Sequence, residues 1–207
     1  MKAHAHSAKS ENVKIHFQNT AKEIVYLALG VSLLTVSAWI GIPFGSVPVT
    51  LQTFAVALIG VLFGAVRGGL AVLIYFLMGL IGIPVFAGFN SGVVALLGPT
   101  GGYMIGFLFD IVIVGLFSRI QMQNRIVKTL LLYLGMLLAL IVLYFFGTLW
   151  FITVYSGKNA VGVGTALALC VVPYCMPDAL KVLFAAIIGI SLKPHLKLNV
   201  KKQKSPQ

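Results

Sequence analysis

Long apolar runs separated by short polar connections make up most of the chain after its first twenty-odd residues. Each run is about 20 residues long, which is the length a helix needs to cross a hydrocarbon core about 30 Å thick. The connections leave no room for a second soluble domain. The pattern therefore predicts an all-α integral membrane protein, with six transmembrane helices in one bundle. The predicted spans are residues 24–43, 48–66, 69–86, 100–118, 129–152 and 163–192.

Composition supports a membrane protein and narrows its function. Of 207 residues, 59% are hydrophobic and 9% are charged, whereas a soluble domain is about 25% charged. The sequence lacks the P-loop pattern G-x-x-x-x-G-K-[ST], the zinc-hydrolase pattern H-E-x-x-H and the nucleophile pattern G-x-S-x-G. No histidine lies in a predicted span. These absences favour a binding or transport role over an enzyme, with no metal or cofactor expected.

Basic residues predict the orientation, because Lys and Arg are enriched in cytoplasmic loops. Lys158 alone lies on the opposite side, and Lys181 lies inside the last span. We therefore expect both termini in the cytoplasm. Residues 1–23 would form a cytoplasmic tail leading into an uncleaved span, residues 24–194 the transmembrane domain, and residues 195–207 a basic cytoplasmic tail. The basic residues assigned to the cytoplasmic side are Lys2, Lys9, Lys14, Lys22, Arg67, Arg119, Arg125, Lys128, Lys193, Lys197, Lys201, Lys202 and Lys204.

The segment PYCMPDALK places an acid and a base three residues apart in the last span. Either charge costs roughly 2.5–3.5 kcal/mol at the centre of a membrane helix, so the pair needs a reason. Pro173 and Pro177 predict a break in the last helix. Asp178 would then lie at the positive end of a new half-helix, with Lys181 one turn later. One interpretation is a ligand site at a broken helix; the other is a structural ion pair.

Two predicted outer connections carry further polar groups at the same level. Gln52 and Thr53 begin the second span, and Asn90 and Ser91 lie in a charge-free, glycine-rich connection. Glycines let the backbone approach a ligand closely and expose amide N–H groups. The alternative for this connection is a flexible exposed loop. Together with the broken helix, the loops predict a pocket open to the exterior.

Three ordered motifs carry a resemblance to a known family. They are PVTLQTFAVALIGVLFGAVRGGLAVLIYFLMGLIGIPVFAG, LLGPTGGYMIGF and PDALKVLFAAIIG. The chain resembles the BioY family of biotin transporters, the substrate-binding subunits of energy-coupling factor transporters, from about residue 24 to 194. The resemblance implies a multi-pass protein of the bacterial cell (inner) membrane that captures biotin from outside. It also implies two kinds of partner, a membrane coupling subunit and cytoplasmic ATPase subunits.

The resemblance also implies roles for particular residues. Asp178 and Lys181 match the ligand-site Asp and Lys of the last motif, and Asn90 is the equivalent of a polar contact in the glycine-rich stretch. The family usually has Gly before this Asp and FAGG in the loop, where this chain has Pro177 and Phe89. An A-x-x-x-A patch on the first helix contacts the coupling subunit in this class, and here its match is Ala28 with Ser32.

The chemistry of biotin suits these side chains. Its ureido ring offers two N–H donors and one carbonyl acceptor, so a carboxylate and an ammonium can bind both edges. The rest of the molecule needs apolar walls, for which the candidates are Phe86, Phe89, Tyr174 and Met176. Donors for its carboxylate are Asn90, Ser91, Gln52 or the glycine-rich backbone, unless Lys181 binds it instead.

Two alternatives to biotin uptake stay open from the sequence. One is a substrate-binding subunit for another vitamin, and the other is a membrane enzyme or scaffold that uses Asp178 and Lys181 as acid and base. Asp110, in the middle of the fourth span, has no role in the family pattern. It is interpreted as a protonated or hydrogen-bonded interior acid, with proton coupling as the alternative.

Overall fold

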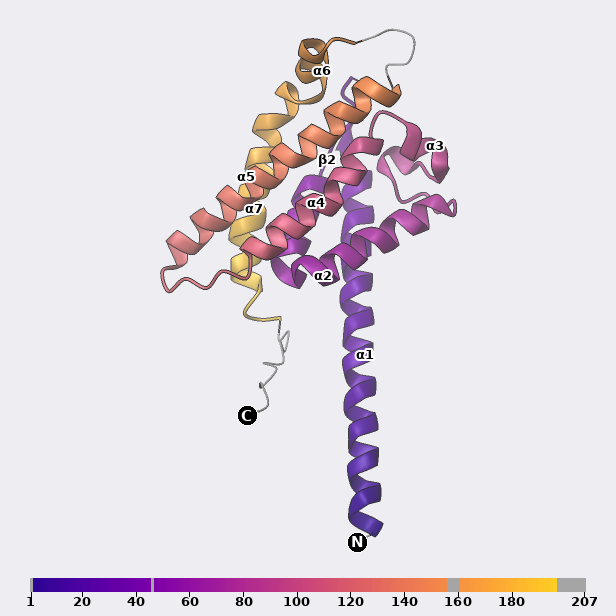
Figure 1. Cartoon of the computed structure of the whole chain (residues 1–207), viewed down its shortest axis with the longest axis vertical. Helices are drawn as coiled ribbons and strands as arrows, with labels where there is room; N and C mark the ends of the chain where they lie inside the picture. Colours follow the sequence, from indigo (N-terminus) through magenta and orange to yellow (C-terminus); the bar gives the residue numbers. More distant parts are fainter. Residues whose placement is uncertain (1, 46, 156–160, 197–207) are drawn as a thin grey trace.

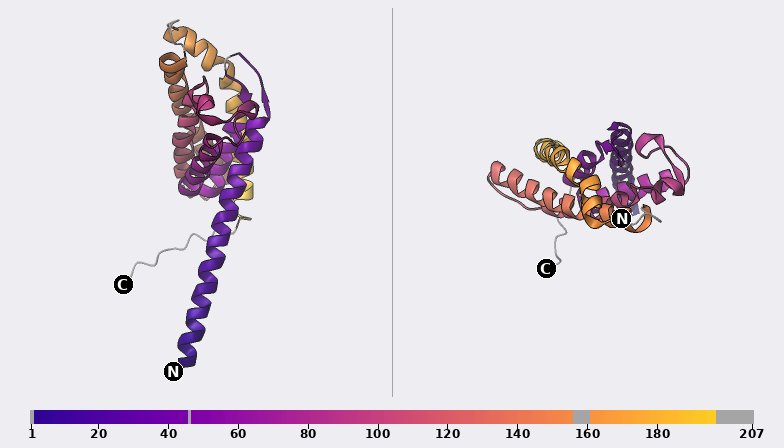
Figure 2. Two further views of the ribbon diagram at one scale, coloured as in Figure 1. Left: turned by 90° about the vertical axis from the view of Figure 1, so that its right-hand side faces the viewer. Right: turned by 90° about the horizontal axis from the view of Figure 1, so that it is seen from above.

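The structure is a computed structural model that describes residues 2–45, 47–155 and 161–196 (Figure 1). Most of this part is helical, in agreement with the predicted all-α class. The first helix, α1 (Lys2–Trp39), is continuous, and its N-terminal half projects beyond the rest of the bundle (Figure 2). The predicted tail and the predicted first span are therefore one helix.

A short hairpin joins α1 to the second helix. Its strands β1 (Gly41–Ile42) and β2 (Val49–Thr50) pair antiparallel. The N–H of Leu51 donates to the carbonyls of Ser37 and Ile40, at 3.1 and 3.0 Å. These bonds hold the end of β2 against the end of α1, and so fix the residues that begin the next helix.

The second helical element, α2 (Gln52–Leu80), reverses direction at Gly64. Gly64 has φ 76° and ψ 179°, a backbone conformation that is essentially restricted to glycine. The Nε2 of Gln52 donates to the Oη of Tyr75 at 3.0 Å although the two residues are 23 positions apart. In a straight helix they would be separated by about 34 Å, so the chain must double back. We call the two antiparallel parts the first arm (52–63) and the second arm (65–80).

The reversal explains how two predicted spans appear as one element. The spans predicted at 48–66 and 69–86 correspond to the first and second arms. Arg67, placed by its charge in the connection between those spans, lies just after the turn. It forms a bidentate ion pair with Glu23 of α1, at 2.5 and 2.6 Å. This pair joins α1 to the start of the second arm.

The chain after α2 forms the 3₁₀ turn η1 (Ala87–Phe89) and the short helix α3 (Gly92–Leu97). Phe86 is buried and packs edge-on against Tyr75 of the second arm, with ring centroids 5.5 Å apart. Its ring lies so close to Gly79 that a Cβ there would come within 1.9 Å of the ring. Gly79 therefore provides the space that Phe86 occupies.

Helices α4 (Gly101–Phe117) and α5 (Arg125–Trp150) pack closely and antiparallel, and a π-helical turn, η2 (Phe151–Tyr155), continues α5. Glycines permit the close approach. Gly106 of α4 faces Leu143 of α5. At its N-terminus α5 is capped by Asn124, whose Oδ1 accepts from the N–H groups of the first turn at 2.8 and 3.3 Å.

The last predicted helix is broken, but upstream of the predicted position. Helix α6 (Val163–Cys170) ends and α7 (Val172–Leu192) begins around Val171, which has φ −125° and ψ −57°. The break was predicted near Pro173 and Pro177, with Pro177 in the first turn of the new half-helix. Pro173 instead lies in the first turn of α7, where the missing N–H costs no helical hydrogen bond. Pro177 is accommodated inside α7.

Asp178 consequently lies in the second turn of α7 and not at its N-terminal end. The predicted stabilisation of its carboxylate by the positive helix end therefore does not apply, because that effect fades after the first turn. Hydrogen-bond donors from α2, α5 and α7 itself stabilise it instead, as described below.

Within the described residues, four helical segments are long and apolar enough to cross a membrane. They are Thr20–Trp39, Gln52–Leu80, Arg125–Thr153 and Val172–Leu192, with Gly101–Phe117 as a shorter apolar helix. Their outward faces carry exposed Leu, Ile, Val and Phe side chains, as lipid contact requires. The predicted outer Lys158 and the tail from residue 197 lie outside the described residues.

Candidate functional site

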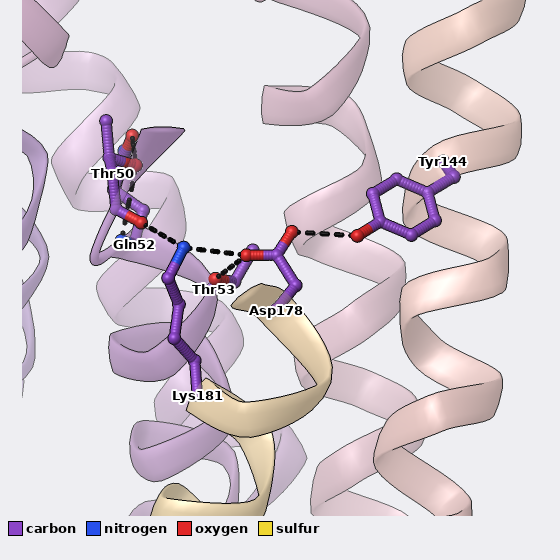
Figure 3. Close-up of polar contacts among 6 residues, drawn as sticks. All are labelled: Thr50, Gln52, Thr53, Tyr144, Asp178 and Lys181. Atoms are coloured by element: carbon purple, nitrogen blue, oxygen red, sulfur yellow. Dashed lines mark hydrogen bonds and ion pairs between the residues drawn. The ribbon is translucent and has the colours of Figure 1, made fainter. Parts of the chain in front are cut away.

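The carboxylate of Asp178 is buried, with 4% of the residue exposed, and receives hydrogen bonds from three helical elements (Figure 3). Thr53 of the first arm of α2 donates to Oδ1 at 2.9 Å, and Lys181 of α7 donates to the same oxygen at 2.7 Å. Tyr144 of α5 donates to Oδ2 at 2.9 Å. Three donors, one of them charged, offset the cost of burying a carboxylate.

Lys181 holds the acid and the hairpin together. Its ammonium donates to Asp178 and also to the backbone carbonyl of Thr50 at 2.7 Å. An ammonium has three donors, so these two bonds leave one N–H for another acceptor. The Oδ2 of Asp178 has Tyr144 as its partner among the described residues and can accept a further bond. The pair therefore keeps one donor, on Lys181, and one acceptor position, on Asp178 Oδ2.

A second polar chain lies next to this pair. Thr50 Oγ1 donates to Gln52 Oε1 at 3.1 Å, Gln52 donates to Tyr75, and Tyr75 donates to the carbonyl of Val85 at 3.0 Å. These bonds connect β2, both arms of α2 and the segment before η1. They fix the orientation of the Gln52 amide.

These side chains line a pocket that is otherwise largely apolar. Its unfilled space is about 620 Å³ when the opening to solvent is included. Tyr174 closes one side and donates to the carbonyl of Val47 in the hairpin. Tyr103 donates to the carbonyl of Cys170 at 2.5 Å and so joins α4 to the end of α6. The lining residues are Val47, Pro48, Val49, Thr50, Gln52, Thr53, Tyr75, Phe86, Ala87, Thr100, Tyr103, Met104, Phe107, Leu143, Tyr144, Tyr174, Asp178 and Lys181.

Five of the predicted ligand-binding residues line this pocket together. They come from segments far apart in the sequence: α2, the loop before η1, and α7. They are Gln52, Phe86, Tyr174, Asp178 and Lys181.

The other three predicted ligand residues do not line the pocket. Phe89 is 63% exposed, has φ 60°, and stacks on Trp39 of α1 at 5.0 Å. Asn90 is exposed, and its Nδ2 donates to the carbonyl of Ala87 at 2.8 Å. Ser91 precedes α3 and makes no capping bond. The ring of Phe89 therefore lies against α1, whereas Phe86 lines the pocket. Met176, considered for an apolar wall, is 75% exposed.

Several pocket residues were not among the predicted ligand residues. Thr53 was noted only as the start of a span, and no motif or charge pattern singled out Tyr75, Tyr103 or Tyr144. The sequence signal that could have identified these tyrosines is their position inside predicted membrane spans. A buried hydroxyl there needs a hydrogen-bond partner. Tyr144 is the one that contacts Asp178.

Asp110 lies outside the pocket. It is 1% exposed in α4, and its Oδ2 has no hydrogen-bond partner among the described residues. It follows Phe107, a pocket residue, by three positions on the same face of α4.

Ala28 and Ser32, the predicted partner contacts, are exposed on α1. They line a shallow apolar groove against Ile74 and Met78 of the second arm of α2. Small side chains at positions i and i+4 let another helix approach closely.

Comparison with known proteins agrees with this architecture. The chain is 40% identical over 173 residues to a "Probable biotin transporter BioY" of Pyrococcus horikoshii, covering 84% of this chain and 97% of the relative. It is 35% identical over 184 residues to a "Biotin transporter BioY" of Thermotoga maritima, covering 87% and 99%.

A solved structure and a family model extend the match. The structure described as the S-component for biotin from an ECF-type ABC transporter superposes with a TM-score of 0.72 at 27% identity, covering 86% of this chain and 93% of that one. The chain is a multi-pass membrane protein with the S-component fold. The model of the BioY family matches residues 7–198, and the chain belongs to that family.

Proposed function

We propose that this chain is a membrane biotin-uptake component, which captures biotin in the pocket around Asp178 and Lys181. Its relatives carry the name of biotin transporters and its fold is that of an S-component for biotin. The observation that carries the proposal is the buried Asp178–Lys181 pair in a largely apolar pocket. Its free donor and acceptor suit a ureido ring.

The pair complements the ureido group atom by atom. One ureido N–H donates to Asp178 Oδ2, which has acceptor capacity left beside its bond from Tyr144. The remaining N–H of Lys181 donates to the ureido oxygen. Phe86, Phe107 and Leu143 supply apolar surface for the thiophane ring and the valeryl chain. In this pose Lys181 serves the ureido oxygen, and the amide of Gln52 is the candidate donor to biotin's carboxylate.

The topology is proposed as six membrane crossings with both termini in the cytoplasm. The crossings are α1, the two arms of α2, α4, α5 and α7. Two observations support this. The N-terminal end of α1 and the C-terminal end of α7 point to the same end of the bundle (Figure 1). The basic residues Arg119, Arg125 and Lys128 lie at that end as well. The pocket then opens at the opposite, outer side of the cell membrane.

Energy for import is proposed to come from separate subunits, because the sequence carries no P-loop. A membrane coupling subunit would pack on the groove beside Ala28 and Ser32. Replacing both residues with Trp is expected to abolish complex formation while biotin binding persists, because the groove does not share side chains with the pocket. An intact complex would contradict this docking surface.

Calorimetric titration of biotin into the purified protein tests the ligand itself. We expect tight binding to the wild type and loss of binding in Asp178→Asn and Lys181→Ala. Thiamine and riboflavin serve as comparison ligands. Binding of one of these without binding of biotin would move the proposal to another vitamin.

A further inference from the structure

Four basic side chains gather at one end of the bundle, away from the biotin pocket. Arg119 follows α4, Arg125 and Lys128 lie in the first turn of α5, and Lys193 follows α7. We call these four residues the basic cluster. Figure 1 shows the end of α4, the start of α5 and the end of α7 at the same end of the molecule.

Two hydrogen bonds bring the three segments together. Lys193 Nζ donates to the carbonyl of Ser118 at 2.8 Å, next to Arg119. Arg125 donates to Ser191 Oγ at 2.7 Å, two residues before Lys193. The cluster is therefore fixed by the fold and not produced by flexible side chains alone.

The basic cluster has no acidic partner among the described side chains. The chain has four acidic residues. Of these, Glu23 pairs with Arg67, Asp178 pairs with Lys181, and Asp110 is buried in α4. Partial burial lowers the pKa of Lys193, and the nearby charges of Lys128 and Arg119 lower it further. Like charges held together in this way gain stability from a bound anion.

An apolar groove begins at the basic cluster and runs up the bundle between α5 and α7. Arg125 lies at its mouth, and its walls carry Ile126, Leu130 and Tyr133 of α5 and Leu183 of α7. On α5 these three residues recur at helical spacing along one face. Its unfilled space is about 690 Å³, including the part open to its surroundings. An apolar groove that faces the membrane and has a cationic mouth is complementary in shape and charge to an anionic phospholipid.

We propose that the basic cluster and this groove form a binding site for one anionic phospholipid. The phosphodiester lies among Arg119, Arg125, Lys128 and Lys193, and one acyl chain lies in the groove between α5 and α7. A soluble anion would use the cluster but not the groove, whereas a zwitterionic lipid would fill the groove but bring a compensating positive charge to the cluster.

The site can be tested on the full-length protein by native mass spectrometry after detergent exchange. The probes are phosphatidylglycerol and phosphatidylcholine with identical acyl chains, and glycerol phosphate without acyl chains. We expect phosphatidylglycerol adducts to survive at concentrations where the other two probes are lost. Equal retention of the two lipids would overturn the proposal.

Variants separate the headgroup from the groove. The triple variant Arg119→Gln, Lys128→Gln, Lys193→Gln removes three charges from the cluster. Its matched control, Lys201→Gln, Lys202→Gln, Lys204→Gln, removes three charges from the C-terminal tail. Each cluster charge contributes roughly a fivefold factor in lipid affinity. We expect the triple variant to bind phosphatidylglycerol on the order of a hundredfold more weakly, and the control to change less than threefold.

A groove variant keeps the test decisive if the triple variant folds poorly. Leu130→Trp fills the exposed groove and leaves every charge in place. It is expected to weaken phosphatidylglycerol binding at least fivefold, with biotin binding unchanged as evidence of folding. Unchanged lipid retention in this variant would overturn the acyl-chain part of the site. If the variants instead lose the coupling subunit while keeping the lipid, the groove is a protein-docking surface and the proposal is wrong.

Discussion

Replacing Lys181 with Met should destabilise the protein, and adding Asp178→Asn should restore the fold without restoring ligand binding. Lys181 Nζ lies 2.7 Å from Asp178 Oδ1, and the two side chains are 14% and 6% exposed. At an effective dielectric constant of about 20, their attraction is about 6 kcal/mol before the opposing cost of desolvation. Removing one partner of such a buried pair costs about 3–5 kcal/mol.

The two variants separate a structural role of the pair from a ligand-binding role. Lys181→Met leaves the charge of Asp178 with Thr53 and Tyr144 as its described donors. The double variant removes both charges and keeps side chains of similar size, so most of the lost stability should return. It has neither the ammonium for the ureido oxygen nor the carboxylate for the ureido N–H. Each lost charge-assisted bond weakens biotin binding by about 10-fold to 150-fold.

The assays are the fraction of protein that remains monodisperse after heating in detergent, and calorimetric titration of biotin. Lys22→Met, a substitution of an exposed lysine of α1, is the control and should change neither. We expect Lys181→Met to be unstable and unable to bind biotin. We expect the double variant to be stable but still unable to bind biotin. A double variant that binds biotin like the wild type would refute the ligand role and leave the pair as a structural ion pair.

Three further predictions follow from packing and charge. Gly79→Ala forces the ring of Phe86 out of its position and should weaken biotin binding by roughly tenfold in calorimetry; Gly69→Ala, with open space around its Cβ, should not. Phe86→Ala should reduce biotin affinity, whereas Phe89→Ala should leave it within twofold, since only Phe86 lines the pocket; equal effects would contradict the assigned pocket wall. Glu23→Gln should lower thermal stability by about 1 kcal/mol or less because its ion pair is partly exposed, and added salt should remove the difference.

The sequence predicted those features of the fold that depend on the pattern of a single segment. Apolar length predicted the helical segments, and Arg67 was placed by its charge in the connection that corresponds to the turn between the two arms of α2. The break in the last helix was predicted, but it lies at Val171 and not directly before Pro177. The proline rules identify where a helix is disfavoured, but Pro173 fits the first turn of α7, so the chain breaks at Val171 instead.

The pocket residues that the sequence predicted most directly are Asp178 and Lys181, because their charges stand out within an apolar span. The site was not predicted where the evidence depends on packing between distant segments. Tyr144 became part of the site because α5 packs beside α7, which the sequence of either helix does not reveal. Phe89 was expected to line the pocket from its place in the loop, but its ring stacks on Trp39 of α1.

The measurement that tests the central claim most directly is an experimental structure of the protein with biotin bound. We expect the ureido ring within hydrogen-bond distance of Asp178 Oδ2 and Lys181 Nζ, with the thiophane ring and valeryl chain against Phe86 and Phe107. Biotin found at another place, with the Asp178–Lys181 pair unchanged and without contact to the ligand, would contradict it.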